Sequence, residues 1–206
     1  MVSKSIHNNY YKSVTTALKC LYITMKTVSI YTDGACSGNQ NETNIGGWGC
    51  ILVYGEHQKE LWGGERNTTN NRMELTAVIE ALKALRKEGL DLEIYSDSSY
   101  VMNCFRDGWY LKWQQNGWMT SRKEPVENKE LWQELIALAL KQNISFYRVK
   151  GHVSLKASDE VLMKRYMKFI EMNGQDFSYA DFLHVTEMNN RADRLANIGI
   201  GEIRGE

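Results

Sequence analysis

The chain has 206 residues, 43% of them hydrophobic, which suits one globular domain with residues left over for an extension or insertion. Twenty-five basic residues balance twenty-five acidic ones, so the overall charge does not indicate a nucleic-acid-binding protein and such an assignment needs a local basic patch. No apolar run approaches the roughly 20 residues of a membrane helix, and the polar start lacks the apolar core of a signal peptide. We therefore expect a cytoplasmic protein with no membrane partner. The four cysteines form no CxxC pair, which favours buried or incidental thiols over a zinc site or a disulfide framework.

Residues 1–25 show no clear hydrophobic periodicity, and the folded pattern begins directly after Met25. We interpret them as a loosely ordered N-terminal extension, or as the product of an upstream start codon with Met25 as the working start. A docking peptide for a partner is the alternative. Residues 26–206 are predicted to form the folded domain.

Three strand-like runs between Thr27 and Glu65, separated by glycines and a turn, predict an antiparallel meander. Helix and strand patterns follow in the order helix 70–89, strand 90–97, helix 98–113, helix 128–142 and a strand within 144–152. Two further helical stretches are predicted at 159–174, where Ser158 is a candidate cap, and at 178–199, as one helix or two. This order indicates an α/β protein with a mixed sheet flanked by helices.

Two of the predicted strands finish on an aspartate at the same phase, in "IYTDG" (30–34) and "IYSDS" (94–98). Because side chains alternate along a strand, Asp33 and Asp97 are expected side by side if the preceding isoleucines face the core on neighbouring strands. Gly34 would let the backbone turn away sharply after Asp33. Two carboxylates about 4 Å apart repel by roughly 4 kcal/mol at an effective dielectric of 20, so they share a proton or bind a cation. Oxygen ligands alone favour a hard ion such as magnesium, whereas the plainer alternative is that each aspartate caps a strand end or a turn.

Three further residues are candidates for the same site. Glu74 is expected in the first turn of an amphipathic helix, where an acid often only complements the helix dipole. Asp193 falls in a predicted helix and could equally be a solvated surface acid. His152 follows a predicted strand in a glycine-softened loop, where a histidine commonly has no catalytic role.

Seven segments together resemble the ribonuclease H family, specifically its type 1 enzymes: "YTDGACSGN", "GGWGCIL", "TTNNRMELTAVIEAL", "IYSDSSYV", "NGWMT…KEPVENKELW", "VKGH" and "NNRADRLA". The resemblance implies a five-stranded mixed sheet of order 3-2-1-4-5 flanked by helices. It also implies an endonuclease that cleaves the RNA strand of RNA–DNA hybrids with two magnesium ions, for which manganese can substitute, leaving 5′-phosphate and 3′-hydroxyl ends. Asp33, Glu74, Asp97 and Asp193 would then form the metal cluster, and His152 matches the family's mobile loop histidine. We expect a monomer.

The resemblance also implies substrate contacts. Asn70 and Asn71 lie where the family reads 2′-hydroxyls and bases across the minor groove, although Asn71 could instead cap the helix. Cys36 and Asn39 fall near the DNA backbone. Residues 109–123 correspond to the family's basic protrusion, whose candidate contacts are Lys112, Trp113, Trp118, Arg122 and Lys123. This protrusion is poorer in lysine than the family pattern, and at least one tryptophan is expected to pack it against the domain.

The chain departs from the family between His152 and Asn190, which lie 38 residues apart here and follow each other closely in the family. The additional material, about 154–188, is expected to form a helical insertion. It either supplies hybrid-binding charge through Lys156, Lys164, Arg165 and Lys168, or is a structural appendage packing Leu162, Met163, Tyr166, Met167 and Phe169. Competing functional hypotheses are another nuclease of the same fold acting on DNA, and a non-catalytic hybrid-binding module.

Overall fold

The computed structural model describes residues 27–37 and 44–206, so the predicted extension at 1–25 and Asn39 lie outside the described residues. Five strands form one sheet of order β3-β2-β1-β4-β5. They are β1 (Thr27–Ser37), β2 (Ile45–Tyr54), β3 (His57–Arg66), β4 (Asp91–Ser96) and β5 (Asn143–Arg148). β1, β2 and β3 are antiparallel neighbours, whereas β4 and β5 run parallel to β1. The predicted mixed sheet and its strand order are confirmed.

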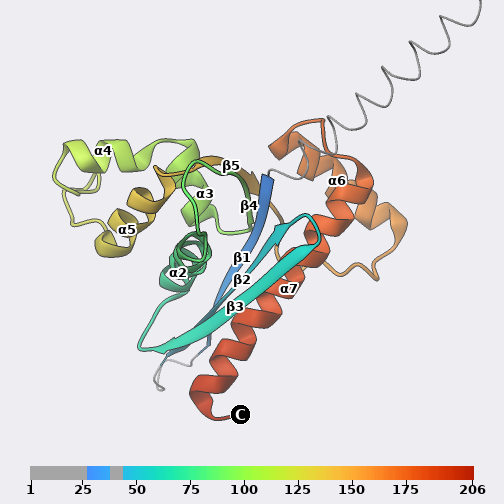
Figure 1. Cartoon of the computed structure of the whole chain (residues 1–206), viewed down its shortest axis with the longest axis horizontal. Helices are drawn as coiled ribbons and strands as arrows, with labels where there is room; N and C mark the ends of the chain where they lie inside the picture. Colours follow the sequence, from blue (N-terminus) through green and yellow to red (C-terminus); the bar gives the residue numbers. More distant parts are fainter. Residues whose placement is uncertain (1–26, 38–43) are drawn as a thin grey trace, which may run out of the picture.

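Helices cover both faces of this sheet (Figure 1). They are α2 (Asn70–Lys83), α3 (Ser99–Arg106), α4 (Trp109–Gln115), α5 (Lys129–Ala139), α6 (Asp159–Asn173) and α7 (Tyr179–Arg204). Helices α2 to α5 lie on one side of the sheet and α6 and α7 on the other (Figure 1). Within residues 27–37 and 44–206, no helix is both long and apolar enough to cross a membrane.

The pairing of β1 with β4 explains the near-repeat in the sequence. Ile30 pairs with Ile94 and Thr32 with Ser96, so the two "IY" runs lie in register on parallel neighbouring strands. The prediction that the chain turns away at Gly34 is wrong, because β1 continues to Ser37. Its antiparallel partner β2 extends past the end of β4 and supplies the hydrogen-bonding edge that keeps β1 extended.

Several helix boundaries differ from the sequence expectation, and α5, for example, ends at Ala139 and not at 142. Helix α2 ends at Lys83, whereas the apolar spacing predicted a helix to 89. The run 98–113 is divided into α3 and α4, because Gly108 adopts a left-handed conformation with φ +64°. Residues 179–204 form one continuous helix, with a capping box in which Ser178 and Asp181 bond each other's backbone N–H.

Two hydrophobic clusters lie on the two faces of the sheet. The first joins Ile30 and Ile94 to α2, α3 and α5, with Trp132 at its centre and fully buried. The second joins Tyr31, Tyr95 and Val149 to α6 and α7. Since successive residues face opposite sides of a strand, this alternation puts Asp33 on the same face as Tyr31 and α7.

Candidate metal centre

Three carboxylates that are distant in sequence converge beside the sheet. Asp33, Glu74 and Asp97 each present an oxygen, and these atoms lie within 4.8 Å of one another. Asp33 is on β1 and Asp97 directly follows β4, one step beyond the Thr32–Ser96 pair, so strand register brings the two aspartates together. Asp33 and Glu74 are each only 5% exposed. The expected adjacency of Asp33 and Asp97 is therefore present, with Glu74 as a third member.

Glu74 reaches this site because α2 approaches β1 unusually closely. A Cβ on Gly34 would lie 2.6 Å from the carbonyl carbon of Met73 and closer still to the Glu74 amide, so only glycine permits this contact. The N-cap of α2 is Thr69, whose hydroxyl accepts a hydrogen bond from the Arg72 N–H at 3.3 Å. Glu74 consequently lies in the second turn. Its assignment to the first turn was wrong, and complementing the helix dipole does not account for its position.

The loop after β5 packs against Asp97. A Cβ on Gly151 would overlap the Asp97 carboxylate, with the carboxyl carbon at 3.0 Å. Any other residue at position 151 would displace either the loop or the carboxylate. Gly151 thus fixes the spacing between Asp97 and the loop that carries His152.

Burial and mutual repulsion shift the protonation of all three acids. Burial, followed by the charges of Asp97 and Asp193, raises the pKa of Asp33 to about 8, against a smaller lowering by the Gly34 N–H. Burial and then Asp33 and Asp97 hold the pKa of Glu74 well above its usual range. Burial also raises the pKa of Asp97, a shift that the nearby His152 and Lys150 side chains oppose. A cation at this site would remove the repulsion that these shifts express.

The donor set fits a hard divalent cation. Glu74 Oε2 and Asp97 Oδ1 are buried and accept no hydrogen bond within the described part of the chain. An orphaned buried carboxylate oxygen is costly unless a proton or a cation satisfies it. Clustered carboxylate oxygens are the ligands that Mg²⁺ and Mn²⁺ prefer. The residues present therefore suit such ions.

Asp193 and His152 lie at the edge of the cluster. Asp193 Oδ2 is 3.8 Å from His152 Nδ1, and its Oδ1 accepts a hydrogen bond from the Asn197 amide at 3.2 Å. Asp193 is close enough to raise the pKa of Asp33, although it is not among the acids grouped within 4.8 Å. The His152 side chain is 78% exposed and its backbone is left-handed, with φ +53°. Such a conformation is uncommon for a residue other than glycine.

Two asparagines hold the loop that carries His152. The Asn190 side chain on α7 donates to the Val153 carbonyl at 2.8 Å. The Asn173 side chain, at the end of α6, accepts from the Arg148 N–H and donates to the Arg148 carbonyl, both at 2.8 Å. Asn173 thereby pairs with the edge strand β5 as a neighbouring strand would. The middle of the segment 154–188 is thus tied to the end of β5, and α7, just after the segment, is tied to the loop.

Comparison with known proteins identifies the family of this chain. The RNase H family model matches residues 25–164. The chain belongs to the ribonuclease H family. The match includes Asp33, Glu74, Asp97 and His152 and ends before Asp193.

Curated relatives carry the name ribonuclease H. One from Syntrophomonas wolfei is 55% identical over 128 residues, which cover 62% of this chain and 86% of the relative. One from Clostridium botulinum is 44% identical over 178 residues, which cover 86% of this chain and 98% of the relative. Among solved structures, LC9-RNase H1, described as a type 1 RNase H with the type 2 active-site motif, is 26% identical with a TM-score of 0.57. That match covers 83% of this chain and 86% of the LC9 chain.

The residues expected to contact a ribonuclease H substrate surround the α2 N-terminus and the end of β1. Asn70 is the first residue of α2, and its amide donates to Glu74 Oε1 at 3.4 Å. Asn71 is the second residue, and the interpretation of Asn71 as the helix cap is wrong because Thr69 holds that position. The Cys36 thiol, half-buried at the end of β1, donates to the Thr68 carbonyl at 3.7 Å.

The predicted protrusion consists of α4 and the loop that follows it. Lys112, Arg122 and Lys123 are exposed. Trp113 packs edge-on against the buried Trp132, with ring centroids 5.5 Å apart, and Trp118 lies 6.1 Å from Trp113. Both tryptophans therefore attach the protrusion to the core, as expected for at least one of them.

Sequence reasoning missed two residues that position the site, Gly151 and Asn173, and one contact, the hydrogen bond from Asn70 to Glu74. The glycine of "VKGH" was interpreted only as softening the loop. The close approach to Asp97 joins segments far apart in the chain, and no local pattern reveals it. Asn70 was singled out, but for substrate contact alone.

Proposed function

We propose that this chain is a metal-dependent endonuclease that hydrolyses the RNA strand of RNA–DNA hybrids and leaves 5′-phosphate and 3′-hydroxyl ends. The observation that carries the proposal is the convergence of three mostly buried carboxylates within 4.8 Å, in a chain of the ribonuclease H family. The names of the curated relatives add support for the substrate class.

Asp33, Glu74, Asp97 and Asp193 would hold the divalent cations, two Mg²⁺ during catalysis or Mn²⁺ in their place. Bound there, the cations supply activation of water and charge stabilisation for an in-line displacement at phosphorus. Asp33, Glu74 and Asp97 lie within 4.8 Å of one another, and Asp193 on α7 is close enough to raise the pKa of both aspartates. Asn70 orients Glu74 through its amide hydrogen bond.

His152 moves a proton at the leaving 3′ oxygen or assists product release. Its exposure and its position on a loop fixed only at its flanks suit a transient contact. Asp193 orients the imidazole through the 3.8 Å approach to Nδ1.

Recognition of the hybrid is assigned to polar groups beside Glu74 and to the protrusion. Asn70 and Asn71 offer amides in the first turn of α2, where they would read 2′-hydroxyls, the group that distinguishes RNA from DNA. Cys36 would lie against the DNA strand, and Asn39 is proposed from its sequence position alone. The exposed cations of the protrusion, Lys112, Arg122 and Lys123, would meet DNA phosphates, with Trp113 and Trp118 supporting the backbone.

One assay tests the proposal. End-labelled hybrid, double-stranded RNA and double-stranded DNA are incubated with the full chain, with and without Mg²⁺. We expect cutting of the RNA strand of the hybrid only, and only with Mg²⁺. Loss of a residue that only supports a metal ligand typically lowers activity by roughly 10–100-fold. Asp33→Asn changes a proposed ligand itself, so its cleavage rate should fall by more than this.

The matched control is Asp176→Asn, an exposed acid in the loop before α7, which should cut at the wild-type rate. Equal cutting of DNA, or cutting without a divalent ion, would refute the assignment. Tight hybrid binding with no cutting under any of these conditions would instead identify a binding module.

A further inference from the structure

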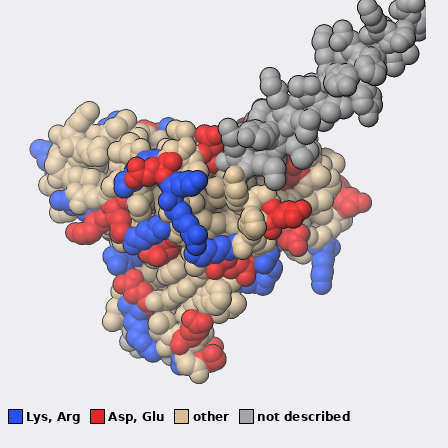
Figure 2. All heavy atoms as spheres, viewed as in Figure 1, with Lys and Arg blue, Asp and Glu red and all other residues tan. Residues whose placement is uncertain are grey.

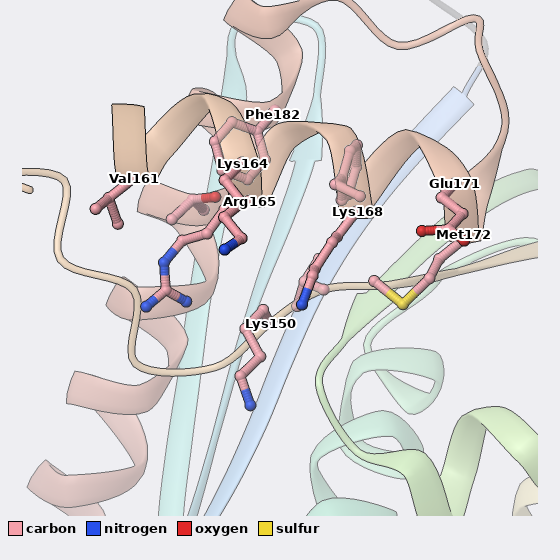
Figure 3. Close-up of a pocket in the computed structure, with 11 residues that line it drawn as sticks. Lys150, Val161, Lys164, Arg165, Lys168, Glu171, Met172 and Phe182 are labelled. Atoms are coloured by element: carbon pink, nitrogen blue, oxygen red, sulfur yellow. The ribbon is translucent and has the colours of Figure 1, made fainter. Parts of the chain in front are cut away.

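A hollow of about 840 Å³ lies between α6 and the loop that follows β5. Lys164, Arg165 and Lys168 extend from α6 toward this loop, which contributes Lys150 (Figure 3). Glu171 is the one acid among the lining residues. Four cations thus gather around a single concave surface in a chain whose net charge is zero. Elsewhere basic and acidic side chains are interspersed, as the face in Figure 2 shows.

Within residues 27–37 and 44–206 these four cations form no ion pair. In the part of the chain that the structure describes, none of them lies within 4.0 Å of a carboxylate, whereas Lys83, Arg106 and Lys141 each form ion pairs. Lys150, Lys164 and Lys168 are exposed and Arg165 is half-buried. Unpaired cations that repel one another around one hollow are available to bind an external polyanion.

The helix that carries three of these cations is firmly attached. Its residues Phe169 and Ile170 are 3% and 7% exposed and belong to the cluster with Tyr95 and Val149 on the sheet, and Phe169 also lines the hollow. Asn173 at its end is bonded to the backbone of Arg148 on β5. Of the apolar residues expected to pack the segment, Leu162 is buried while Met163 and Met167 are exposed. Helix α6 is therefore fixed by its buried apolar residues, while Lys164, Arg165 and Lys168 extend along the hollow.

The hollow adjoins the metal centre through the loop that carries Lys150 and Gly151. Lys150 lines the hollow, and its charge acts on Asp97, which directly follows β4. Its neighbour Gly151 touches the Asp97 carboxylate. Helix α4, with Lys112, lies on the opposite side of the sheet from α6 (Figure 1). A duplex at the carboxylates would thus have a cationic surface on each side.

We propose that Lys150, Lys164, Arg165 and Lys168 form a second phosphate-binding surface, which holds the backbone of the hybrid on the α6 side of the metal centre. The inference rests on the proposed function, since it assumes that the substrate is a nucleic-acid duplex. It assigns to the segment 154–188 the hybrid-binding charge that the lysine-poor protrusion does not supply.

The test compares two triple variants of the full chain that remove equal charge. Lys164→Gln/Arg165→Gln/Lys168→Gln neutralises the hollow and leaves Lys150, which adjoins Asp97, intact. The control, Arg86→Gln/Lys87→Gln/Lys141→Gln, neutralises residues around the starts of β4 and β5, at the end of the sheet opposite to Asp97. Affinity for a fluorescent hybrid of about 24 base pairs, roughly two helical turns, is measured by anisotropy in EDTA across a series of salt concentrations.

We expect the control to keep the wild-type slope of log affinity against log salt. The slope of the α6 variant should be shallower by about 0.9 for each phosphate that the protein no longer neutralises, and so by roughly 2–3 in all. The same slope in both triple variants would overturn the proposal. If circular dichroism shows that the triple variant is unfolded, Lys164→Gln/Lys168→Gln, which changes only exposed residues, gives the same decision with an expected decrease of about 1.8 in the slope. Failure of the proposed function is distinguishable, because it would appear as wild-type chain that does not cut the hybrid in Mg²⁺.

Discussion

Asp33→Asn should stabilise the metal-free protein while it abolishes activity. Asp33, Glu74 and Asp97 present oxygens within 4.8 Å of one another. At that separation two full charges repel by about 3.5 kcal/mol at an effective dielectric of 20. Removing the charge of Asp33 removes this repulsion toward each neighbour that is ionised. Because the raised pKa of Glu74 disfavours its ionised form, we count only the repulsion between Asp33 and Asp97. Removing it should increase the free energy of unfolding by about 3 kcal/mol.

The gain should depend on pH in a defined direction. The folded-state pKa of Asp33 is raised from 3.8 to about 8, so the folded protein binds this proton more tightly than the unfolded chain does. The stability that this proton contributes is complete below about pH 4 and is lost as the pH rises toward 8. The asparagine variant has no such proton to lose. Its advantage should therefore be small at pH 4 and largest above pH 8.

Thermal unfolding in EDTA at pH 5 and pH 9 measures this effect. For a chain of this size 1 kcal/mol corresponds to about 2–4 °C, so Asp33→Asn should melt roughly 6–12 °C above wild type at pH 9 and much closer to it at pH 5. Asp176→Asn, an exposed acid, is the control and should melt with wild type at both pH values. A variant that melts below wild type at pH 9, or a difference independent of pH, would refute the electrostatic reasoning.

Two further substitutions test how the site is positioned. In Gly151→Ala the new methyl group would overlap the Asp97 carboxylate. We expect the Mg²⁺ concentration required for hybrid cleavage to rise at least roughly tenfold, with little change in melting temperature. An unchanged Mg²⁺ titration would contradict this. Asn173→Ala leaves the Arg148 N–H and carbonyl without partners, and should cost about 1–3 kcal/mol in denaturant unfolding. It should also speed amide exchange at 148–153 relative to a Gln175→Ala control, and equal exchange in the two variants would show that α6 does not hold this loop.

The sheet and the pairing of Asp33 with Asp97 were predictable because they depend on local periodicity. Period-two alternation identified the strands, and the matching phase of "IYTD" and "IYSD" anticipated the register in which Ile30 pairs with Ile94. The strand order came from the resemblance to the family. The strands and the register were predicted correctly because the apolar residues that mark a strand are also those that bury its inner face.

The errors arose where neighbouring elements override a local signal. Four consecutive polar residues, "TTNN", are all acceptable helix caps, and only the structure selects Thr69, which moves Glu74 into the second turn. The glycine after Asp33 suggested a turn, yet its purpose is to admit the backbone of α2 beside β1. Gly151 acts on Asp97 in the same way across 54 positions of sequence. Contacts of this kind depend on backbone proximity and leave no periodic pattern.

The central claim, that these acids form a site for divalent cations, is tested most directly by titration calorimetry of Mg²⁺ into the EDTA-stripped, dialysed chain at about pH 7, in two buffers of different ionisation enthalpy. We predict saturable uptake whose heat differs between the buffers, because a cation displaces the proton that the raised pKa of Asp33 retains in the free protein. In Asp33→Asn the saturable heat should disappear. The absence of saturable uptake in wild type, or the same uptake in Asp33→Asn, would contradict the account.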